Sequence, residues 1–348
     1  MKLDIHLGRL RDIASSAPQE EDTGIAGLWS AETGHDPFVS LSVAAAVTSR
    51  VDIGTAIAVA FARTPLTVAS VGNDLQELSG GRLVLGLGSQ VRAHIQNRYS
   101  MPWSRPAARM REFVLAMHAI WSCWLEGEPL RFEGDFYRHT LMTPAFSPGR
   151  HDFGRPRVFL SAVGPGMTAV AGEVADGMLV HPFSTERYLR EVTMPALQRG
   201  AERATRERPS FEIAAPNFVV TGATQEEYDR AAAATRQRIA FYASTPAYRP
   251  VLELHGWGDL QEELNRLSKQ GEWTKMGTLV TDEMLETFAV CAEPDEVGAK
   301  VAQRYGDLCD RVTLGGVAVG GSHRADTIEG LASVAPAPRG DLPPSPRS

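Results

Sequence analysis

The chain has 348 residues, 43% of them hydrophobic and 22% charged, which is the composition of a globular protein with a sizeable core in one or two domains. Its formal net charge of −7 argues against an extended nucleic-acid surface, because such a surface needs clustered Lys and Arg to displace counterions from phosphates. The N-terminus has no secretory apolar region and no run reaches the length of a membrane span, so we expect a cytoplasmic protein without a membrane partner.

The N-terminal part of the chain alternates between strand and helix signals. Apolar runs predict strands over residues 3–7, 27–31 and 51–61. Asp36-Pro37 and Thr64-Pro65 each place a capping side chain before a proline, which predicts a helix starting at each pair. The connection after the first strand is expected to be helical only in part, because Pro18 interrupts it.

A glycine-rich stretch follows the third of these strands. Gly80 and Gly81 suit the left-handed conformation that ends a helix, and the apolar run 83–87 predicts a buried parallel strand. Gly86 and Gly88 at its end remove side chains that would keep a ligand from the backbone. An ordinary tight turn after a strand is the alternative explanation of these two glycines.

The middle of the chain has one helix, one irregular region and then regular alternation. Residues 110–124 carry apolar side chains at i, i+3, i+4 and i+7, which is typical of a helix packed on the core. The region 129–154 breaks into short aromatic-rich pieces and predicts a surface hairpin. We then expect a strand over 158–162, a helix over 167–174 and a strand over 178–180.

The C-terminal part is mainly helical between two strands. Helical sequence runs over 186–207 and 225–254, and a helical insertion is expected at about 255–290. The remaining predicted elements are the strands 211–220 and 311–314 and the helix 295–308.

Eight strand signals separated by helices favour an α/β fold of the closed (β/α)8 TIM-barrel type over an open sheet. We expect a single domain over 1–319 that carries the hairpin and the helical insertion. From residue 320 the sequence is rich in Gly, Ser, Ala and Pro, so the tail 320–348 is expected to be disordered.

The three cysteines are widely spaced and give neither a disulfide framework nor a zinc motif, so we expect no metal. Cys123 falls in the apolar helical pattern and is interpreted as a core residue, with a reactive thiol as the alternative. Cys291 and Cys309 complete the set.

Several of these pieces, taken in order, resemble the bacterial luciferase-like superfamily, and within it the class that uses the deazaflavin coenzyme F420. The matching pieces are Glu32, HDPF (35–38), IGTAI (53–57), RTP (63–65), LSGGR (78–82), LGLG (85–88), SAVGP (161–165) and ADG (175–177). Each piece is common alone, but their order and spacing over about residues 2–180 are specific. The resemblance implies a barrel with its cofactor at the carboxyl ends of the strands.

The resemblance also implies which residues line the cofactor. The bond between Ala56 and Ile57 matches a non-proline cis peptide that backs the deazaflavin ring in this family, whereas the residues alone predict an ordinary trans bond. The phosphate site is assigned to the helix start at Gly164, Pro165, Gly166 and Met167, and Ala162 and Val163 before it are also assigned to the cofactor. The other side of the cofactor is assigned to Gly86, Gly88, Ser89 and Gln90.

The phosphate assignment has a physical basis, because a helix start offers free backbone amides and glycine lets an anion approach them. A plain strand-to-helix turn is the alternative. Arg92, His94 and Arg98 follow the glycine-rich strand in a predicted loop. They either pair with the carboxylates of the glutamyl tail of F420 or belong to a solvated charged loop.

Three candidate catalytic residues fall just beyond predicted strands. His35 is the first choice for handling a proton, because imidazole titrates near neutral pH and the position matches a family residue near the deazaflavin. Its alternative role is to support the helix cap at Asp36. Glu32 is expected to be a buried, hydrogen-bonded organiser of the same loop. His181 either contacts the cofactor or shapes the substrate pocket.

The resemblance therefore implies an F420-dependent oxidoreductase that transfers a hydride between the deazaflavin and a small organic substrate. Two alternatives stay open: an FMN-dependent monooxygenase of the same fold, and a cofactor-binding barrel without turnover. Some sugar-phosphate dehydrogenases of this family carry a proton-donating glutamate shortly after the glycines of the fourth strand. This sequence has Gln90 and Val91 there, and neither does that work, so that activity is in doubt. The resemblance also suggests a homodimer, and Tyr248, Trp257 and Trp273 belong either to an apolar lid or subunit contact or to the core.

Overall fold

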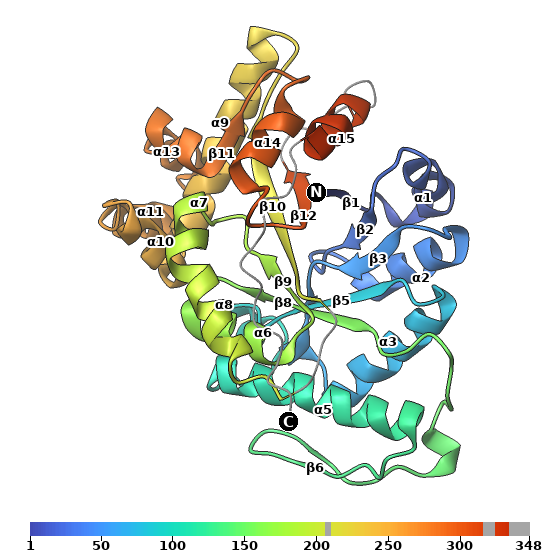
Figure 1. The fold of residues 1–348 in the computed structure, drawn as a ribbon. Coiled ribbons are helices and arrows are strands. Elements are labelled where there is room, and N and C mark those ends of the chain that lie inside the picture. Colours follow the sequence, from blue (N-terminus) through green and yellow to red (C-terminus); the bar gives the residue numbers. More distant parts are fainter. Residues whose placement is uncertain (206–209, 316–323, 334–348) are drawn as a thin grey trace.

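The computed structural model describes residues 1–205, 210–315 and 324–333. Within these ranges eight parallel strands form a closed barrel with helices on its outside (Figure 1). The order around the ring is β10, β12, β1, β2, β3, β5, β8, β9, and β9 pairs with β10 to close it. The predicted TIM barrel is therefore confirmed, with strands β1 (Lys2–His6), β2 (Gly27–Ser30), β3 (Asp52–Thr55), β5 (Leu83–Gly88), β8 (Arg157–Ala162), β9 (Gly177–Val180), β10 (Glu212–Val220) and β12 (Arg311–Gly315).

Most of the barrel strands carry apolar side chains on both faces, as a parallel sheet covered by helices requires. All six residues of β5 and all four of β9 are buried. One set of side chains packs against the surrounding helices, and another set fills the barrel itself. The second set comes from five different strands and makes the centre a packed core rather than a pore: Trp29, Val84, Phe159, Leu179 and Ala214.

The predicted helix starts are confirmed. The Asp36 carboxylate accepts the N–H of Phe38 at 2.9 Å, and the Thr64 hydroxyl accepts the N–H of Thr67 at 3.3 Å. A proline occupies the first helical position after each cap. The helices around the barrel are α1 (Ile13–Glu21), α2 (Pro37–Val47), α3 (Pro65–Leu78), α5 (Pro106–Glu126), α6 (Pro165–Val174), α7 (Glu186–Tyr188), α8 (Met194–Ala201), α9 (Gln225–Ala243) and α14 (Val297–Tyr305).

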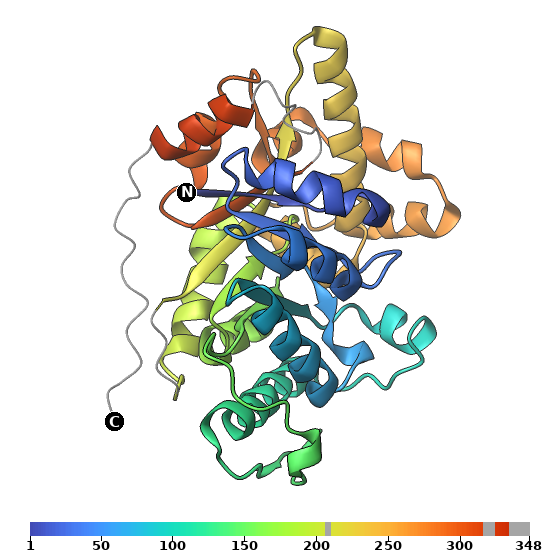
Figure 2. The same ribbon diagram turned by 90° about the vertical axis from the view of Figure 1, so that its right-hand side faces the viewer.

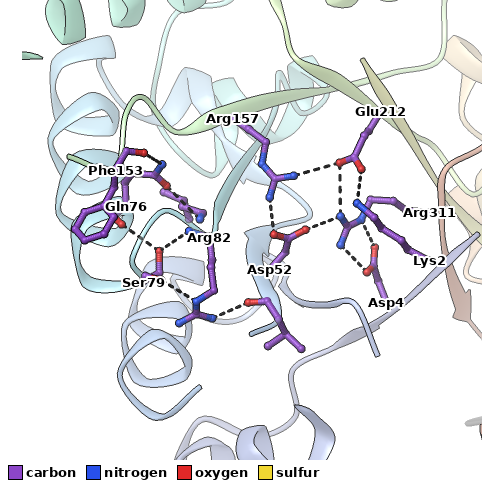
Figure 3. A network of polar contacts seen from close by, with 12 residues as sticks. Lys2, Asp4, Asp52, Gln76, Ser79, Arg82, Phe153, Arg157, Glu212 and Arg311 are labelled. Carbon is purple, nitrogen blue, oxygen red and sulfur yellow. Dashed lines mark hydrogen bonds and ion pairs between the residues drawn. The ribbon is translucent and has the colours of Figure 1, made fainter. Parts of the chain in front are cut away.

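The glycines after α3 adopt the conformation expected of them, with φ values of 64° at Gly80 and 91° at Gly81. Arg82 follows and donates hydrogen bonds to the carbonyls of Val51, at 2.6 Å, and Thr48, at 2.8 Å. The turn thereby ties the start of β5 to the segment that leads into β3, and Figure 3 shows its polar contacts beside Ser79 and Gln76.

Two N-terminal elements differ from the expectation. Helix α1 runs through Pro18, and hydrogen bonds such as Asp22 N–H to the Pro18 carbonyl, 3.1 Å, continue past the ring. The predicted strand over 51–61 is divided into β3 and β4 (Ala58–Val59), followed by the 3-10 turn η2 (Ala60–Ala62). The division falls at a cis peptide bond between Ala56 and Ile57, which confirms the bond that the resemblance implies.

The two insertions lie on different parts of the molecule (Figures 1 and 2). The first contains the predicted hairpin, in which β6 (Phe132–Glu133) and β7 (Arg138–His139) pair antiparallel, and then the turn η3 (Pro144–Phe146). The second contains three helices that pack with α9 around a separate apolar core, α11 (Leu260–Gln270), α12 (Trp273–Thr278) and α13 (Asp282–Phe288).

Three C-terminal details correct the expectation. The helical region over 225–254 is broken at Ser244 into α9, the 3-10 turn η5 (Pro246–Tyr248) and α10 (Arg249–Leu254). The helical sequence over 186–207 ends at Ala201 in α8, after a π-helical turn η4 (Leu189–Thr193), and residues 206–209 lie outside the described ranges. The helical insertion is followed directly by β11 (Ala289–Cys291), which pairs in parallel with β10.

The expected disordered tail contains a helix, α15 (Arg324–Ser333). It packs closely on α14, because a side chain at Gly298 would place its Cβ 2.3 Å from the Thr327 carbonyl oxygen. Leu331 is buried in the contact. The expectation of disorder is therefore wrong for 324–333, and the remainder of the predicted tail lies outside the described residues.

A network of charged side chains fills the amino-terminal end of the barrel (Figure 3). The Arg311 guanidinium is fully buried and bonds both carboxylate oxygens of Asp4 at 2.8 Å and one oxygen of Asp52 at 2.6 Å. Arg157 contacts Asp52 at 2.6 Å and Glu212 at 3.3 Å. These residues stand at or near the starts of β12, β1, β3, β8 and β10, so they occupy this end and leave the carboxyl end for a site.

No helix in the described ranges combines the length and the apolar character that crossing a membrane requires.

Candidate active site

A cavity of about 850 Å³ opens at the carboxyl ends of β3, β5, β8 and β9. This is the end of the barrel at which this fold builds its active sites. One part of the wall comes from the loops that follow these strands, and the other part from the chain between α9 and the end of α11. The lining includes nine of the predicted site residues: Ile57, Gly88, Ser89, Gln90, Ala162, Val163, Gly164, Met167 and His181.

The two glycines of β5 serve different purposes. A Cβ at Gly88 would lie 2.9 Å from Cδ1 of Ile57, so this glycine makes room for the side chain that follows the cis bond and also lines the cavity. A Cβ at Gly86 would lie 1.9 Å from the Thr55 carbonyl oxygen. Gly86 is buried in the barrel wall away from the cavity lining, and strand packing requires that it has no side chain. Ala56 is half-buried and also lies outside the lining.

The chain turns sharply after β5. Gln90 has a φ of 58°, which is left-handed for a residue with a side chain, and its Oε1 accepts the N–H of Val91 at 3.0 Å. Such backbone is sparsely populated and clusters at ligand sites. The segment predicted as a loop is the short helix α4 (Arg92–Asn97), so Arg92 and His94 are helical residues, and exposed Arg92 lies on the cavity lining.

The start of α6 is open toward solvent and has no capping side chain. Its first intrahelical bond runs from the Thr168 N–H to the Gly164 carbonyl at 3.1 Å, so the amides of Gly166 and Met167 precede the hydrogen-bond ladder. No atom lies within 4 Å of a Cβ built on Gly164 or Gly166. Pro165 and Gly166 are exposed and stand just outside the lining. This end of α6 therefore fits the phosphate of a bound cofactor.

Glu32 is placed as an organiser of its loop. Its Oε2 accepts the N–H of Val59 at 2.7 Å and a bond from Arg63 at 2.6 Å, and its Oε1 accepts the Tyr99 hydroxyl at 3.1 Å. The carboxylate is 8% exposed and lies outside the cavity lining. The side chain thereby fixes the segment that follows the cis bond.

His35 is exposed and does not reach the cavity lining. Its neighbour Asp36 bonds Arg63 at 2.7 Å as well as capping α2, so the support of this cap does not depend on the histidine. The proton-handling role of His35 stays a prediction.

His181 does line the cavity. Its Nδ1 accepts the N–H of Phe183 at 3.1 Å, and its Nε2 lies 3.2 Å from the hydroxyl oxygen of Tyr248. The rings of Tyr242 and Tyr248 lie 4.8 Å and 4.5 Å from the imidazole centroid. Burial lowers the pKa of His181 to about 4, so its imidazole is neutral at physiological pH.

Tyr248 is the residue of this site to which the sequence assigned no specific role. It lines the cavity from η5, and burial raises the pKa of its phenol to about 12. The sequence carries one signal for it, an aromatic residue between two prolines that stand inside the predicted helical region 225–254. The pairing with His181, 67 positions away, follows only from the barrel closing.

No group of three or more His, Cys, Asp or Glu in the described ranges could hold a metal ion. Cys123 is half-buried against the main core, as expected, and none of the three cysteines lines the cavity. The site therefore consists of an apolar wall, a helix start and a pair of hydrogen-bonding aromatic residues.

Comparisons with known proteins agree with this architecture. The model of the luciferase-like monooxygenase family matches residues 3–311. An uncharacterized protein of Mycobacterium tuberculosis is 53% identical over 313 residues, which cover 90% of this chain and 92% of that protein. The 5,10-methylenetetrahydromethanopterin reductase of Archaeoglobus fulgidus is 27% identical over 285 residues, with 80% and 81% covered.

The barrel is also similar to a solved structure. The coenzyme F420 dependent tetrahydromethanopterin reductase of Methanopyrus kandleri superposes with a TM-score of 0.75 at 25% identity, covering 94% of this chain and 97% of that one. The family match spans the whole barrel and the relatives are matched over most of their length. The chain belongs to the luciferase-like monooxygenase family.

Proposed function

We propose that this protein is an F420-dependent oxidoreductase that transfers a hydride between the deazaflavin and a small organic substrate. The observation that carries the proposal is the uncapped start of α6 beside a cavity backed by Ile57 and Gly88. The likeness to F420-dependent reductases in sequence and fold supports the choice of coenzyme.

In this proposal each part of the cavity wall binds one part of the coenzyme. The amides of Gly166 and Met167 hold the phosphate, and Ile57, Gly88 and Val163 contact the ring. The carbonyl of Val163 is fixed by the buried Tyr188, whose hydroxyl donates to it at 3.3 Å. Arg92 at the lining is the cation for the glutamyl tail.

When bound, the deazaflavin supplies the hydride. The protein orients the ring, excludes water with the apolar residues of the wall and leaves part of the cavity beside His181 for the substrate. The Gln90 amide is not an acid and does not transfer a proton to a substrate, so the proton-handling group is sought at His35 or on the His181 side.

FMN is the alternative, because its phosphate fits the same helix start and the family is named for monooxygenases. Titration of the purified chain with F420 and with FMN distinguishes the two. We expect F420 to bind more tightly than FMN. Tight binding of FMN without binding of F420 would contradict the proposal. Binding of neither coenzyme would favour a barrel without this chemistry.

The phosphate position has its own test at Gly164, whose backbone, with φ −75° and ψ 153°, accepts any side chain. In the Gly164→Asp variant a carboxylate caps α6 and repels a phosphate at the same place. The matched control is Gly164→Asn, which caps the helix without the charge. We expect F420 affinity about tenfold lower for the Asp variant than for the Asn variant. Equal affinities in a fluorescence titration would place the phosphate elsewhere.

A further inference from the structure

The hydroxyl of Tyr248 is oriented by a chain of hydrogen bonds that starts at the backbone. The Phe183 N–H donates to Nδ1 of His181, so Nδ1 uses its lone pair there. A neutral imidazole carries one proton, and with Nδ1 accepting, that proton is on Nε2. The 3.2 Å contact between Nε2 and the Tyr248 oxygen is therefore a bond in which the imidazole donates and the phenol accepts.

This direction leaves the Tyr248 proton free for another acceptor. In the described part of the chain, the bond with His181 is the one hydrogen bond of the Tyr248 hydroxyl. The residue lines the cavity from the part of the wall that residues 244–268 form, whereas the residues assigned to the coenzyme come from 57–167. The hydroxyl is consequently a donor with no acceptor among the described residues, at the edge of the substrate space.

The ring that carries this hydroxyl is held firmly. It stacks at a tilt on His181 and packs on Phe183 with a centroid distance of 6.0 Å. The segment that leads into η5 is braced from α11, since Gln261 and Asn265 both donate to the Ser244 carbonyl, at 3.1 Å and 2.9 Å. A fixed donor costs little reorganisation when a partner arrives, which is the property of groups that stabilise polar substrates.

We infer that Tyr248 is a substrate-contacting residue whose hydroxyl donates a hydrogen bond to an oxygen or nitrogen acceptor, and that the substrate is accordingly a carbonyl or imine compound rather than an alkane or a cation. His181 is the positioning residue that sets the direction of the bond. The inference deepens the proposed function, because polarising a C=O or C=N bond prepares its carbon to receive a hydride.

The first test compares two probes of nearly equal shape, acetophenone and α-methylstyrene, which differ by an oxygen in place of a methylene group. Because α-methylstyrene is the more apolar probe, the readout is the ratio of the two affinities, and we expect Tyr248→Phe to weaken the binding of acetophenone relative to that of α-methylstyrene about tenfold. The matched control is Tyr242→Phe, because Tyr242 packs on the same imidazole but lies outside the cavity lining. Circular dichroism and melting confirm that both variants fold.

An affinity ratio that is unchanged in Tyr248→Phe, or that changes equally in Tyr242→Phe, would overturn the inference. The bound carbonyl gives a second readout, since its infrared stretch shifts to lower frequency on accepting a hydrogen bond. We expect that shift with the intact chain and its loss with Tyr248→Phe.

The inference depends on which nitrogen of His181 carries the proton, and this is measured without any ligand. Nitrogen-15 spectra of the histidines, assigned through the His181→Gln variant, are expected to show His181 protonated on Nε2 from about pH 5.5 to 8. A proton on Nδ1 would reverse the bond and overturn the inference. None of these measurements uses F420, so a failure of the proposed coenzyme and a failure of the Tyr248 assignment are distinguished.

Discussion

The two histidines selected from the sequence differ in their surroundings, and the surroundings determine their chemistry. His35 is exposed on a loop, whereas His181 is enclosed by Tyr242, Tyr248 and Phe183 and already accepts a backbone N–H. Burial lowers the pKa of His181 to about 4. His181 therefore orients a neighbour by a neutral hydrogen bond at physiological pH and carries no charge.

The depressed pKa of His181 has a consequence for stability. In the unfolded chain its pKa returns to about 6.5, so as pH falls from 6.5 toward 4 the unfolded state takes up a proton that the folded state does not. We expect the free energy of unfolding to fall over that window by at most ~3 kcal/mol more than in His181→Gln. Urea unfolding of both proteins at several pH values measures the difference. A pH-independent difference would contradict a buried neutral imidazole.

Gly86 and Gly88 show what can and cannot be inferred from a single residue in the sequence. The motif containing Gly86 and Gly88 predicted a ligand against both, and the structure places only Gly88 on the cavity. Gly86 is required because the Thr55 carbonyl approaches it closely. A glycine in the sequence is the same residue whether a ligand or a neighbouring strand excludes its side chain. Which of the two applies depends on an atom of another strand, which the local sequence does not show.

Elements with a cap or an uninterrupted apolar run were predicted well. Elements that form only because a neighbouring strand pairs with them were not. Helices α2 and α3 begin at their predicted caps. In contrast, β11 has three residues directly after α13, without a turn between them, and it is a strand only because β10 lies beside it. The division of the 51–61 strand is likewise invisible in a continuous apolar run.

Helix α15 depends on two glycines at its contact with α14. A Cβ at Gly330 would lie 2.7 Å from the Ala299 nitrogen, which is backbone and has no freedom to move aside. We expect Gly330→Ala to undock α15 and to accelerate hydrogen exchange over 324–333, while the barrel melts cooperatively as before. Ala332→Ser, at an exposed position of the same helix, is the control. Unchanged exchange in Gly330→Ala would contradict this packing.

At the scale of the whole molecule, the barrel has one end devoted to stability and one to ligands. The charged residues that fill the amino-terminal end stand singly at the starts of different strands, so no sequence pattern indicates that they form one group. Their proximity follows from closing the ring, which brings the starts of β1 and β12 together with that of β3. The closed barrel itself was predictable, because the number and alternation of strands and helices are local properties.

The buried pair at this end predicts a large effect of one substitution. Arg311→Ala leaves Asp4 buried without its cation, and we expect a loss of about 3–5 kcal/mol in the free energy of unfolding. Arg157 binds the same Asp52 but is 35% exposed, so Arg157→Ala is the control and is expected to cost about 1 kcal/mol or less. Urea denaturation measures both. Similar losses for the two variants would show that burial of the network is not what stabilises this end.

The bracing of the Ser244 carbonyl by Gln261 and Asn265 has an evolutionary consequence. The proposed coenzyme wall is encoded between residues 57 and 167, while Tyr248 and its braces are encoded after residue 243, in a block with its own apolar core. Recombination between two barrels of this kind, with a crossover in the stretch between these blocks, would exchange the residues that contact the substrate and keep the residues that bind the coenzyme. A laboratory chimera made at that boundary would inherit its coenzyme from one parent and its selectivity from the other.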